Sequence, residues 1–258
     1  MEQVTVIKVG GAIVEDVERL AQLLDSFAAL PGQKVLVHGG GRRATKVASA
    51  LGIESKMVEG RRITDADMLE VVTMVYGGLV NKNIVAQLQS RGVNAVGLTG
   101  ADMNVMHSHK RPKKDGVDYG FVGDVDKADG RRLLSLIRDG LTPVMAPLTH
   151  DGMGHILNTN ADTIAAETAK ALAREGAMTT LVYCFEKAGV LADPDDESSV
   201  ISTINRDEFV RLVANGTISG GMIPKITNAL AAVDAGVVRV IITRAESIGT
   251  VTGTVITR

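Results

Sequence analysis

The chain has 258 residues, with 28 Lys and Arg against 30 Asp and Glu, and a formal net charge of -2. This charge balance lacks the basic surplus of a nucleic-acid binder, and with only 3% aromatic residues the chain has few side chains that could stack on bases. No apolar run approaches the roughly 20 residues of a transmembrane helix. The single cysteine, Cys184, excludes an internal disulfide and is typical of a reducing compartment, so we expect a cytoplasmic protein.

Short β-branched runs alternate with amphipathic segments along the chain, as in a parallel sheet covered by helices. Several of the runs are continuously apolar, which indicates strands buried on both faces. The expected strands are residues 4–9, 34–38, 95–99, 142–145, 179–184, 238–243 and 253–256. Between them, apolar residues recur with a period near 3.6, and the expected helices are residues 17–30, 43–51, 65–79, 131–139, 161–175, 207–215 and 224–235.

Two segments interrupt this alternation. Residues 103–126 contain a basic cluster at 110–114, and we expect β-hairpins or a mobile arm there. Residues 193–199 are expected to form an acidic surface loop. Neither segment has the composition of a flexible interdomain linker, so one continuous sheet with two functional lobes is predicted.

Glycine is concentrated in three clusters, of which Gly10-Gly11 and Gly39–Gly41 follow predicted strands and Gly220-Gly221 precedes a predicted helix. Residues without a side chain let backbone N–H groups approach a ligand closely, and a helix N-terminus adds about half a positive charge. Each cluster alone is equally well explained as a tight turn.

Cations beside these clusters favour an anion site. Lys8 lies in an apolar strand, where an ammonium group must reach water, pair with a carboxylate or face a ligand. Lys225 opens a helix, where a positive charge is disfavoured unless an anion lies nearby. The Arg42-Arg43 pair repeats this pattern after the second cluster. Because open α/β sheets bind ligands at the carboxyl ends of their strands, we predict a cleft for a phosphate and a carboxylate there.

The segment 158–162, Asn-Thr-Asn-Ala-Asp, precedes a predicted helix. Asn160 is explained equally well as a helix cap. Two asparagines and an aspartate exceed what one cap needs, however, and Asp162 is a candidate to lie between Lys8 and Lys225. The five histidines and Cys184 are expected to pack or face solvent rather than react.

Two familiar phosphate-binding motifs compete with this interpretation. The P-loop pattern does not occur. Residues 39–44 satisfy the dinucleotide fingerprint, but the acidic residue that it needs roughly 20 positions further on has no clear counterpart at a strand end. An NAD-binding dehydrogenase therefore stays as an alternative, as does a non-catalytic nucleotide-binding module.

Five blocks of sequence, collinear from Lys8 to Lys225, together resemble the amino-acid kinase superfamily. They are Lys8-Val9-Gly10-Gly11, His38-Gly39-Gly40-Gly41, Gly60-Arg61-Arg62-Ile63-Thr64, Asn158-Thr159-Asn160-Ala161-Asp162 and Gly220-Gly221-Met222-Ile223-Pro224-Lys225. Within the superfamily, the blocks are most similar to the branch that phosphorylates the side-chain carboxylate of N-acetylglutamate in arginine biosynthesis.

The resemblance implies a three-layer αβα sandwich around an open, mainly parallel, eight-stranded sheet of the carbamate kinase type. Residues 1–157 would form the lobe that binds the acylglutamate, and residues 158–258 the lobe that binds ATP. Mg²⁺ would be held mainly by the nucleotide phosphates, with no metal ligand from the protein. The substrate carboxylate would attack in line, so positioning and electrostatics would supply the catalysis.

The resemblance also implies residue roles. Lys8 and Lys225 would stabilise charge on the transferring phosphoryl group, and Asp162 would orient both lysines. Arg62 would clamp the α-carboxylate, a task suited to a guanidinium, and Asn158 would bind the amino-acid end of the substrate. The remaining implied residues are Gly40 and Gly41 for the substrate, and Gly10, Gly11, Gly220, Gly221 and Glu186 for the nucleotide phosphates.

Some features leave the substrate and assembly open. The basic residues 110–114 and the Arg42-Arg43 pair exceed what an acetyl group requires, so N-succinylglutamate and carrier-bound aminoadipate remain alternative substrates. Arginine-inhibited members of the family carry an additional N-terminal helix. Because the sequence starts directly at a predicted strand, we expect a homodimer without feedback inhibition by arginine.

Overall fold

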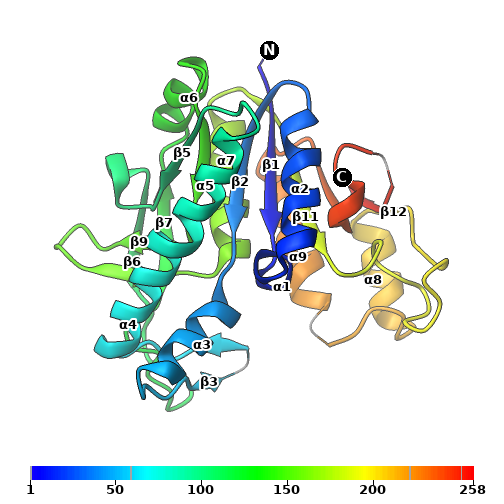
Figure 1. The fold of residues 1–258 in the computed structure, drawn as a ribbon. Coiled ribbons are helices and arrows are strands. Elements are labelled where there is room, and N and C mark those ends of the chain that lie inside the picture. Colours follow the sequence, from blue (N-terminus) through cyan, green and yellow to red (C-terminus); the bar gives the residue numbers. More distant parts are fainter. Residues whose placement is uncertain (1, 59, 221, 251) are drawn as a thin grey trace.

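An eight-stranded sheet forms the centre of the molecule (Figure 1). The computed structural model describes residues 2–58, 60–220, 222–250 and 252–258. The strand order is β12-β14-β13-β11-β1-β2-β8-β5, and every neighbouring pair is parallel except β13 with β14. The strands are β1 (Gln3–Val9), β2 (Gln33–His38), β5 (Ala95–Leu98), β8 (Thr142–Met145), β11 (Met178–Phe185), β12 (Thr203–Ile204), β13 (Arg239–Arg244) and β14 (Thr254–Ile256).

All seven strands predicted from the sequence are confirmed, with ends shifted by at most two residues. The eighth strand, β12, has two residues and pairs with β14 at the edge of the sheet. Two residues cannot form a recognisable run of β-branched side chains, so its sequence carried no strand signal.

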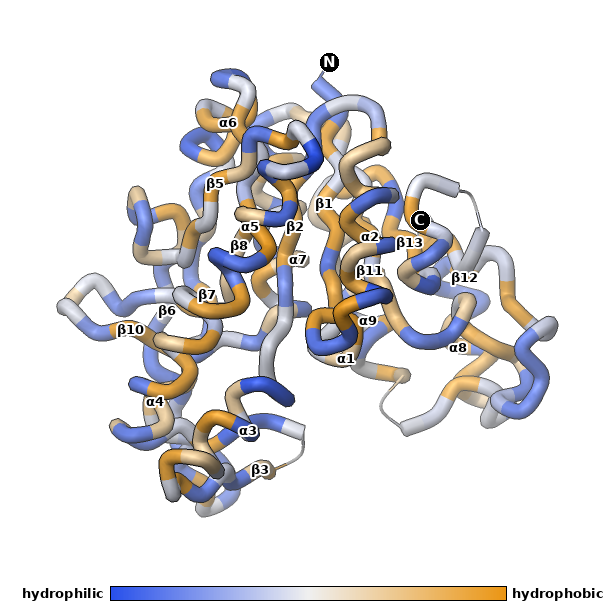
Figure 2. The backbone as a smooth tube through the Cα atoms, in the orientation of Figure 1, coloured by the Kyte–Doolittle hydropathy of each residue, from blue (hydrophilic) through white to orange (hydrophobic). Residues whose placement is uncertain are grey.

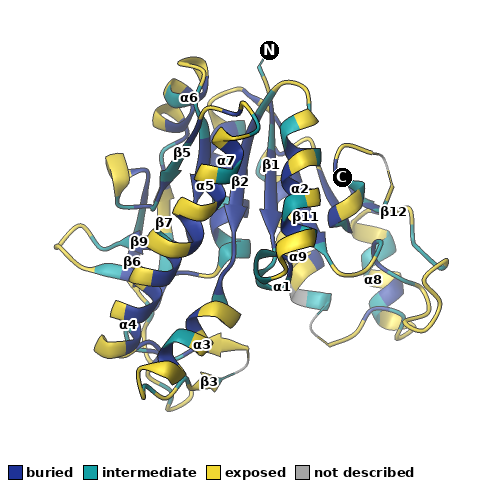
Figure 3. Ribbon diagram, viewed as in Figure 1, coloured by how far each residue is buried: buried dark blue, intermediate teal, exposed yellow. Residues whose placement is uncertain are grey.

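Helices cover both faces of the sheet and complete three layers. Alternate residues of β1 belong to different cores: Val6 packs on the face covered by α6 to α9, and Ile7 on the face covered by α1 to α5. The sheet strands are accordingly buried in Figure 3, while the helices in Figure 2 alternate between hydrophobic and hydrophilic residues. The helices are α1 (Gly11–Glu15), α2 (Val17–Ala29), α3 (Gly41–Ala50), α4 (Ala66–Val72), α5 (Asn81–Gln89), α6 (Gly130–Arg138), α7 (Ala161–Arg174), α8 (Arg206–Ala214) and α9 (Met222–Asp234).

The predicted helix 65–79 ends too early. The chain continues from α4 through a π-helix, η1 (Thr73–Val80), directly into α5. The predicted helix already contained Gly77-Gly78 and stopped at Leu79, whereas the π-helix that includes both glycines runs on to Val80 and into α5. The continuation as α5 buries Ile84 and Leu88 in the core on this face of the sheet, so packing favours the longer helical segment.

A second sheet, in the order β10-β9-β6-β7, lies beside the first. Its strands are β6 (Met106–Lys110), β7 (Gly123–Ala128), β9 (Leu148–His150) and β10 (Ile156–Asn158). The β6–β7 pair confirms the hairpin interpretation of residues 103–126. Among the helices of the described residues, none combines the length and hydrophobicity needed to cross a bilayer.

A buried polar network lies where β2 ends. The His38 side chain is fully buried, its Nδ1 lies 2.7 Å from the Gly39 carbonyl oxygen, and its Nε2 lies 3.1 Å from Asn81 Nδ2. Burial lowers the pKa of His38 to about 4, because the imidazolium would lose its hydration, and the positive charge of Lys82 acts in the same direction. His38 is therefore neutral at physiological pH.

This burial makes folding stability depend on pH. The unfolded chain protonates His38 near pH 6.5 and the folded chain only near pH 4, so acid favours the unfolded state between these values. Above pH 6.5, we expect the titration of His38 to leave the free energy of unfolding unchanged. As the pH falls from 6.5 to 4, we expect it to lower the free energy of unfolding by up to about 3 kcal/mol.

Urea unfolding of the wild type and of His38→Asn between pH 8 and pH 4 measures this contribution. Other groups titrate in both proteins, so the difference between the two curves isolates His38. Parallel curves would contradict the prediction.

Candidate functional site

The carboxyl ends of β1, β2 and β11 meet at one edge of the central sheet, where two cavities open. The larger has a volume of about 480 Å³ and the smaller about 190 Å³. Gly41, the first residue of α3, lines both. The two cavities therefore adjoin at the glycine turn that follows β2, at the end of the sheet where the sequence predicted a cleft.

The larger cavity gathers most of the predicted nucleotide residues. It is lined by Gly10, Gly11, Glu186 and Lys225, together with the Phe185 ring. The Glu186 side chain is exposed, and its carboxylate lies 3.8 Å from the guanidinium of Arg42, which also lines the cavity. Lys8 is 8% exposed and is not among the described residues that line either cavity.

Gly220 and Gly221 were also predicted for the nucleotide. Gly220 is described, but it is not among the residues that line either cavity in the described part of the chain. Gly221 lies outside the described residues. Gly220 therefore does not line the cleft, while Lys225, one turn into α9, reaches it.

Lys8 and Lys225 converge on one aromatic ring. Their ammonium nitrogens lie 5.6 and 4.3 Å from the centre of the Phe185 ring, at the end of β11. A ring face stabilises a nearby cation by about 0.5–2 kcal/mol. Phe185 was not predicted as a site residue, because an aromatic at the end of an apolar strand has the same sequence pattern as a core residue.

Asp162 neutralises one of these lysines. Lys8 Nζ lies 2.7 Å from Asp162 Oδ1. That oxygen makes no hydrogen bond in the described part of the chain, so the pair is a close charge contact rather than an aligned hydrogen bond. Among the ion pairs of the described residues, Asp162 contacts Lys8 and not Lys225. The expected contact with both lysines is thus found for one of them.

Local structure fixes Asp162 at this place. Asn160 caps α7, its Oδ1 accepting hydrogen bonds from the N–H groups of Asp162 at 2.7 Å and Thr163 at 3.3 Å. The Tyr183 hydroxyl donates to the Asp162 carbonyl oxygen at 3.2 Å. The capping interpretation of Asn160 is confirmed, and the cap presents a carboxylate in the first helical turn, where the helix dipole favours it.

The backbone nitrogens of Gly11, Gly40 and Gly41 lie close together where the turns after β1 and β2 meet. The amide nitrogens of Gly40 and Gly41 lie 3.5 and 3.6 Å from the point that a side-chain Cβ on Gly11 would occupy. Among the described residues, none of the N–H groups of Gly11, Gly40 and Gly41 has a hydrogen-bond partner. Converging, unpaired N–H groups at two helix starts form an arrangement suited to phosphate or carboxylate oxygens.

The smaller cavity brings together all four predicted substrate residues, which are Gly40, Gly41, Arg62 and Asn158. Arg62 is 8% exposed, and its guanidinium donates to the Gly41 carbonyl oxygen and to Thr45 Oγ1, both at 2.9 Å. These bonds tie Arg62 to the first turn of α3, so the cation and the glycine turn are held as one unit.

Asn158, at the end of β10, is held by two other segments of the same chain. Its side-chain Nδ2 donates to Thr64 Oγ1 at 2.9 Å, and its backbone N–H donates to the Phe121 carbonyl oxygen at 2.8 Å. Thr159 is tied to Thr149 of β9 by a hydroxyl hydrogen bond of 2.8 Å. The second sheet therefore positions the segment 158–160 against the cleft.

Tyr76 is a cavity residue that the sequence did not reveal. It lies in η1, lines the smaller cavity, and its ring packs so closely on Gly40 that a Cβ there would lie 2.9 Å from Tyr76 Cδ1. Burial raises the pKa of Tyr76, so its hydroxyl stays protonated. The π-helix that places it is a feature often found at functional sites, but it is visible only in the structure, and the sequence predicted an ordinary helix there.

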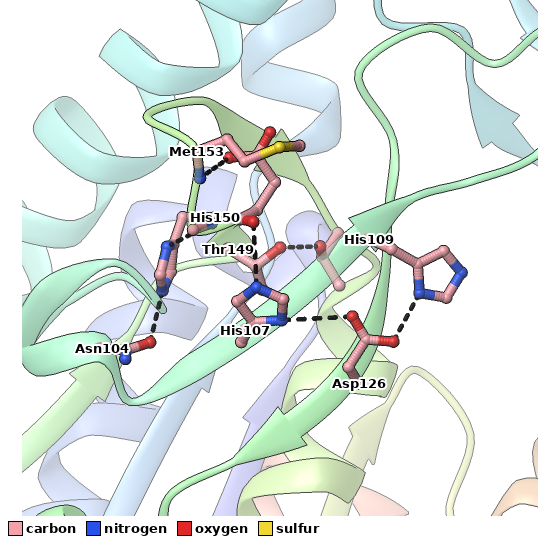
Figure 4. Close-up of polar contacts among 10 residues, drawn as sticks. Asn104, His107, His109, Asp126, Thr149, His150 and Met153 are labelled. Atoms are coloured by element: carbon pink, nitrogen blue, oxygen red, sulfur yellow. Dashed lines mark hydrogen bonds and ion pairs between the residues drawn. The ribbon is translucent and has the colours of Figure 1, made fainter.

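The other histidines lie on or beside the second sheet. Figure 4 shows His107 and His109 on either side of Asp126, with His107 Nδ1 at 3.3 Å and His109 Nδ1 at 2.6 Å from its carboxylate oxygens. His150 Nε2 lies 2.8 Å from Asn104 Oδ1. No group of three or more metal-binding side chains is present among the described residues. These histidines do not line either cavity described above.

Cys184 is buried below the larger cavity, and burial raises the pKa of its thiol to about 12. The thiol is therefore protonated at physiological pH and is not a nucleophile. This confirms the expectation that Cys184 is a packing residue.

Comparisons with known proteins identify relatives of this chain. A family model described as the amino acid kinase family matches residues 3–244. The acetylglutamate kinase of Phocaeicola vulgatus is 66% identical over 99% of this chain and 98% of its own length, and that of Bacteroides thetaiotaomicron is 67% identical over 96% and 95%. The crystal structure of N-acetylglutamate synthase from Neisseria gonorrhoeae, in complex with coenzyme A and N-acetylglutamate, superposes with a TM-score of 0.83 at 25% identity, covering 99% of this chain and 59% of that one.

Proposed function

The chain belongs to the amino acid kinase family, and on this premise we propose that it transfers the γ-phosphoryl group of ATP to the side-chain carboxylate of N-acetyl-L-glutamate, a step of arginine biosynthesis. The observation that carries the proposal is the high identity, over nearly the whole chain, to relatives named acetylglutamate kinase. The two cavities that meet at Gly41 support it, because a kinase must bring two substrates together at one point.

The proposed arrangement places ATP in the larger cavity and the acylglutamate in the smaller one. Arg62 binds the α-carboxylate, Asn158 binds the amino-acid end, and the side-chain carboxylate lies at the glycine turn. A carboxylate oxygen forms a bond to the γ-phosphorus while the bond from that phosphorus to the bridging oxygen of ADP breaks. The products are ADP and an acyl phosphate. The attacking carboxylate is already deprotonated, so no general base is needed.

The charges of the cleft support the same reaction. Lys8 and Lys225 approach one ring from β1 and α9, and Asp162 offsets only part of their positive charge. The remaining positive charge and the N–H groups of Gly11 and Gly40 suit the oxygens of a phosphoryl group in transfer. Preorganised donors of this kind are worth roughly 3–4 kcal/mol each in a transition state.

Magnesium fits this cleft as an ion carried by the nucleotide. Glu186 lines the larger cavity, so an oxygen donor of the type that Mg²⁺ prefers is present beside the proposed nucleotide site. When bound, Mg²⁺ neutralises charge on the phosphates.

We also propose that residues 1–157 supply the acylglutamate lobe and residues 158–258 the nucleotide lobe. The larger cavity draws on both, with Gly10 and Gly11 from the first and Phe185 and Lys225 from the second. The transferring group would therefore lie at the boundary between the lobes.

A homodimer is the proposed assembly. In the described part of the chain, β5 ends the central sheet with a single neighbour, β8, and the η1 side chains Met74 and Leu79 are 53% and 40% exposed. An open sheet edge and exposed apolar side chains are features that a second copy would cover. Light scattering after size exclusion should give twice the monomer mass of 27.1 kDa, and a monomer mass at micromolar concentration would contradict the proposal.

The activity is tested by trapping its product. Purified protein with ATP, Mg²⁺, N-acetyl-L-glutamate and hydroxylamine should give a hydroxamate, because hydroxylamine captures an acyl phosphate. N-succinyl-L-glutamate, assayed in parallel, should give a lower kcat/KM. A higher value for the succinyl compound would overturn the choice of acyl group, and no hydroxamate from either compound would overturn the kinase proposal itself.

The two lysines are tested by Lys8→Ala and Lys225→Ala. Each removes a charge that acts on the transferring group, so we expect kcat to fall about 100-fold to 1000-fold. The exposed Lys127 of β7 provides the control, and Lys127→Ala should keep wild-type kinetics. A rise in KM at unchanged kcat in the two cleft variants would mean that the lysines only bind substrate.

A further inference from the structure

His38 lies directly below the glycine turn, yet the proposed reaction gives it no role. It is the last residue of β2, it is fully buried, and the turn Gly39–Gly41 begins immediately after it. Its two ring nitrogens contact the Gly39 carbonyl oxygen and the Asn81 side chain. A buried imidazole with both nitrogens engaged fixes the groups that it touches.

The partners of His38 determine which nitrogen carries the proton. The Gly39 carbonyl oxygen can only accept, so the proton resides on Nδ1, which donates to it at 2.7 Å. The bare Nε2 then accepts from Asn81 Nδ2 at 3.1 Å.

The orientation of the Asn81 amide agrees with this assignment. Its Nδ2 also donates to the Val144 carbonyl oxygen at 2.9 Å, and its Oδ1 accepts from Lys82 Nζ at 3.1 Å. One assignment therefore satisfies every donor and acceptor of the network, which links β2, α5 and β8.

The bond from His38 sets the direction of the next peptide. The described chain has no cis peptide bonds, and in a trans peptide the carbonyl and the following N–H point in opposite directions. With the Gly39 carbonyl directed at His38, the Gly40 N–H points away from His38. The Gly40 nitrogen lies 3.5 Å from the point that a Cβ on Gly11 would occupy, and its N–H has no partner among the described residues. The Gly39 N–H is bonded to the Val9 carbonyl oxygen at 2.9 Å, which fixes the other side of the same residue.

A glycine turn needs such a constraint. Peptides between glycines rotate at little steric cost. The three successive glycines therefore have no intrinsic preference for the orientation in which the Gly39 carbonyl points at His38. The Tyr76 ring packs against Gly40 and limits its position, but an aromatic ring does not choose between the two orientations of a peptide. The hydrogen bond from His38 makes that choice.

We propose that His38 is a positioning residue, whose Nδ1–H bond to the Gly39 carbonyl holds the Gly40 N–H toward the transferring phosphoryl group, with Asn81 holding the imidazole. The proposal rests on the phosphoryl transfer proposed above. It assigns to Gly40 a preorganised donor and to His38 no contact with substrate. Losing the bond lets the peptide turn, which removes the donor from the cleft.

Three substitutions separate the two nitrogens of His38. In His38→Asn the side-chain Nδ2 takes the place of imidazole Nδ1 and keeps the bond to Gly39. In His38→Gln the carboxamide reaches the position of Nε2 and keeps only the contact with Asn81. His38→Leu keeps neither and has a similar volume.

We expect kcat to fall at least tenfold in the Gln and Leu variants and to stay within about threefold of wild type in the Asn variant. The KM values for ATP and N-acetylglutamate should change less than kcat, because the donor acts on developing charge. An Asn variant as impaired as the Leu variant, or a Gln variant with wild-type kcat, would overturn the proposal. The Asn and Gln variants decide the question if the Leu variant does not fold.

The tautomer provides a test on the unmodified protein. In uniformly ¹⁵N,¹³C-labelled wild type, the imidazole nitrogens of His38 are assigned through the side-chain carbons, and their shifts should show a protonated Nδ1 and a bare Nε2. A proton on Nε2 would overturn the proposal whatever the variants do. If the wild type forms no hydroxamate, the proposed function fails while the tautomer remains measurable, so the two failures are distinguishable.

Discussion

The arrangement of the cleft depends on two ammonium groups that the fold brings to one place against their mutual repulsion. Burying Lys8 in a strand would be costly if it were unpaired, and Asp162 compensates it at 2.7 Å. Lys225 lies by the same ring without a carboxylate of its own in the described part of the chain. One carboxylate for two lysines leaves a net positive charge, which favours the binding of an anion.

Backbone geometry complements these charges. Parallel strands all present their carboxyl ends at the same edge, so the turns after β1 and β2 come together although about 30 residues separate them in the sequence. Each turn leads into a helix whose first N–H groups have no partner within the helix. Glycine at these points lets the two turns approach so closely that a Cβ on Gly39 would lie 3.0 Å from the Gly11 nitrogen.

Much of this could be predicted from the sequence, and what could not has physical reasons. Apolar runs predicted the strands, and charged residues in apolar segments, such as Lys8, predicted the cleft. A buried ammonium group loses its hydration, so a carboxylate or a ligand must compensate for this loss. No comparable signal marked Phe185, Tyr76 or Asn81. An aromatic or amide side chain inside an apolar segment is commonly a core residue, so the sequence pattern does not distinguish it from a site residue. The contact of Asp162 with one lysine rather than two depends on side-chain geometry that no spacing rule contains.

His38 shows a role that the sequence pattern could not predict. The sequence predicted that its histidines pack or face solvent, and His38 does pack, with no exposed surface. Packing and hydrogen bonding are not alternatives for an imidazole, however, because a buried ring must satisfy both nitrogens or pay for an unsatisfied one. Once both are satisfied, the ring is fixed, and so is the peptide that it holds. A flexible glycine turn can therefore be rigid in its folded context, with the rigidity supplied by a residue that never meets the ligand.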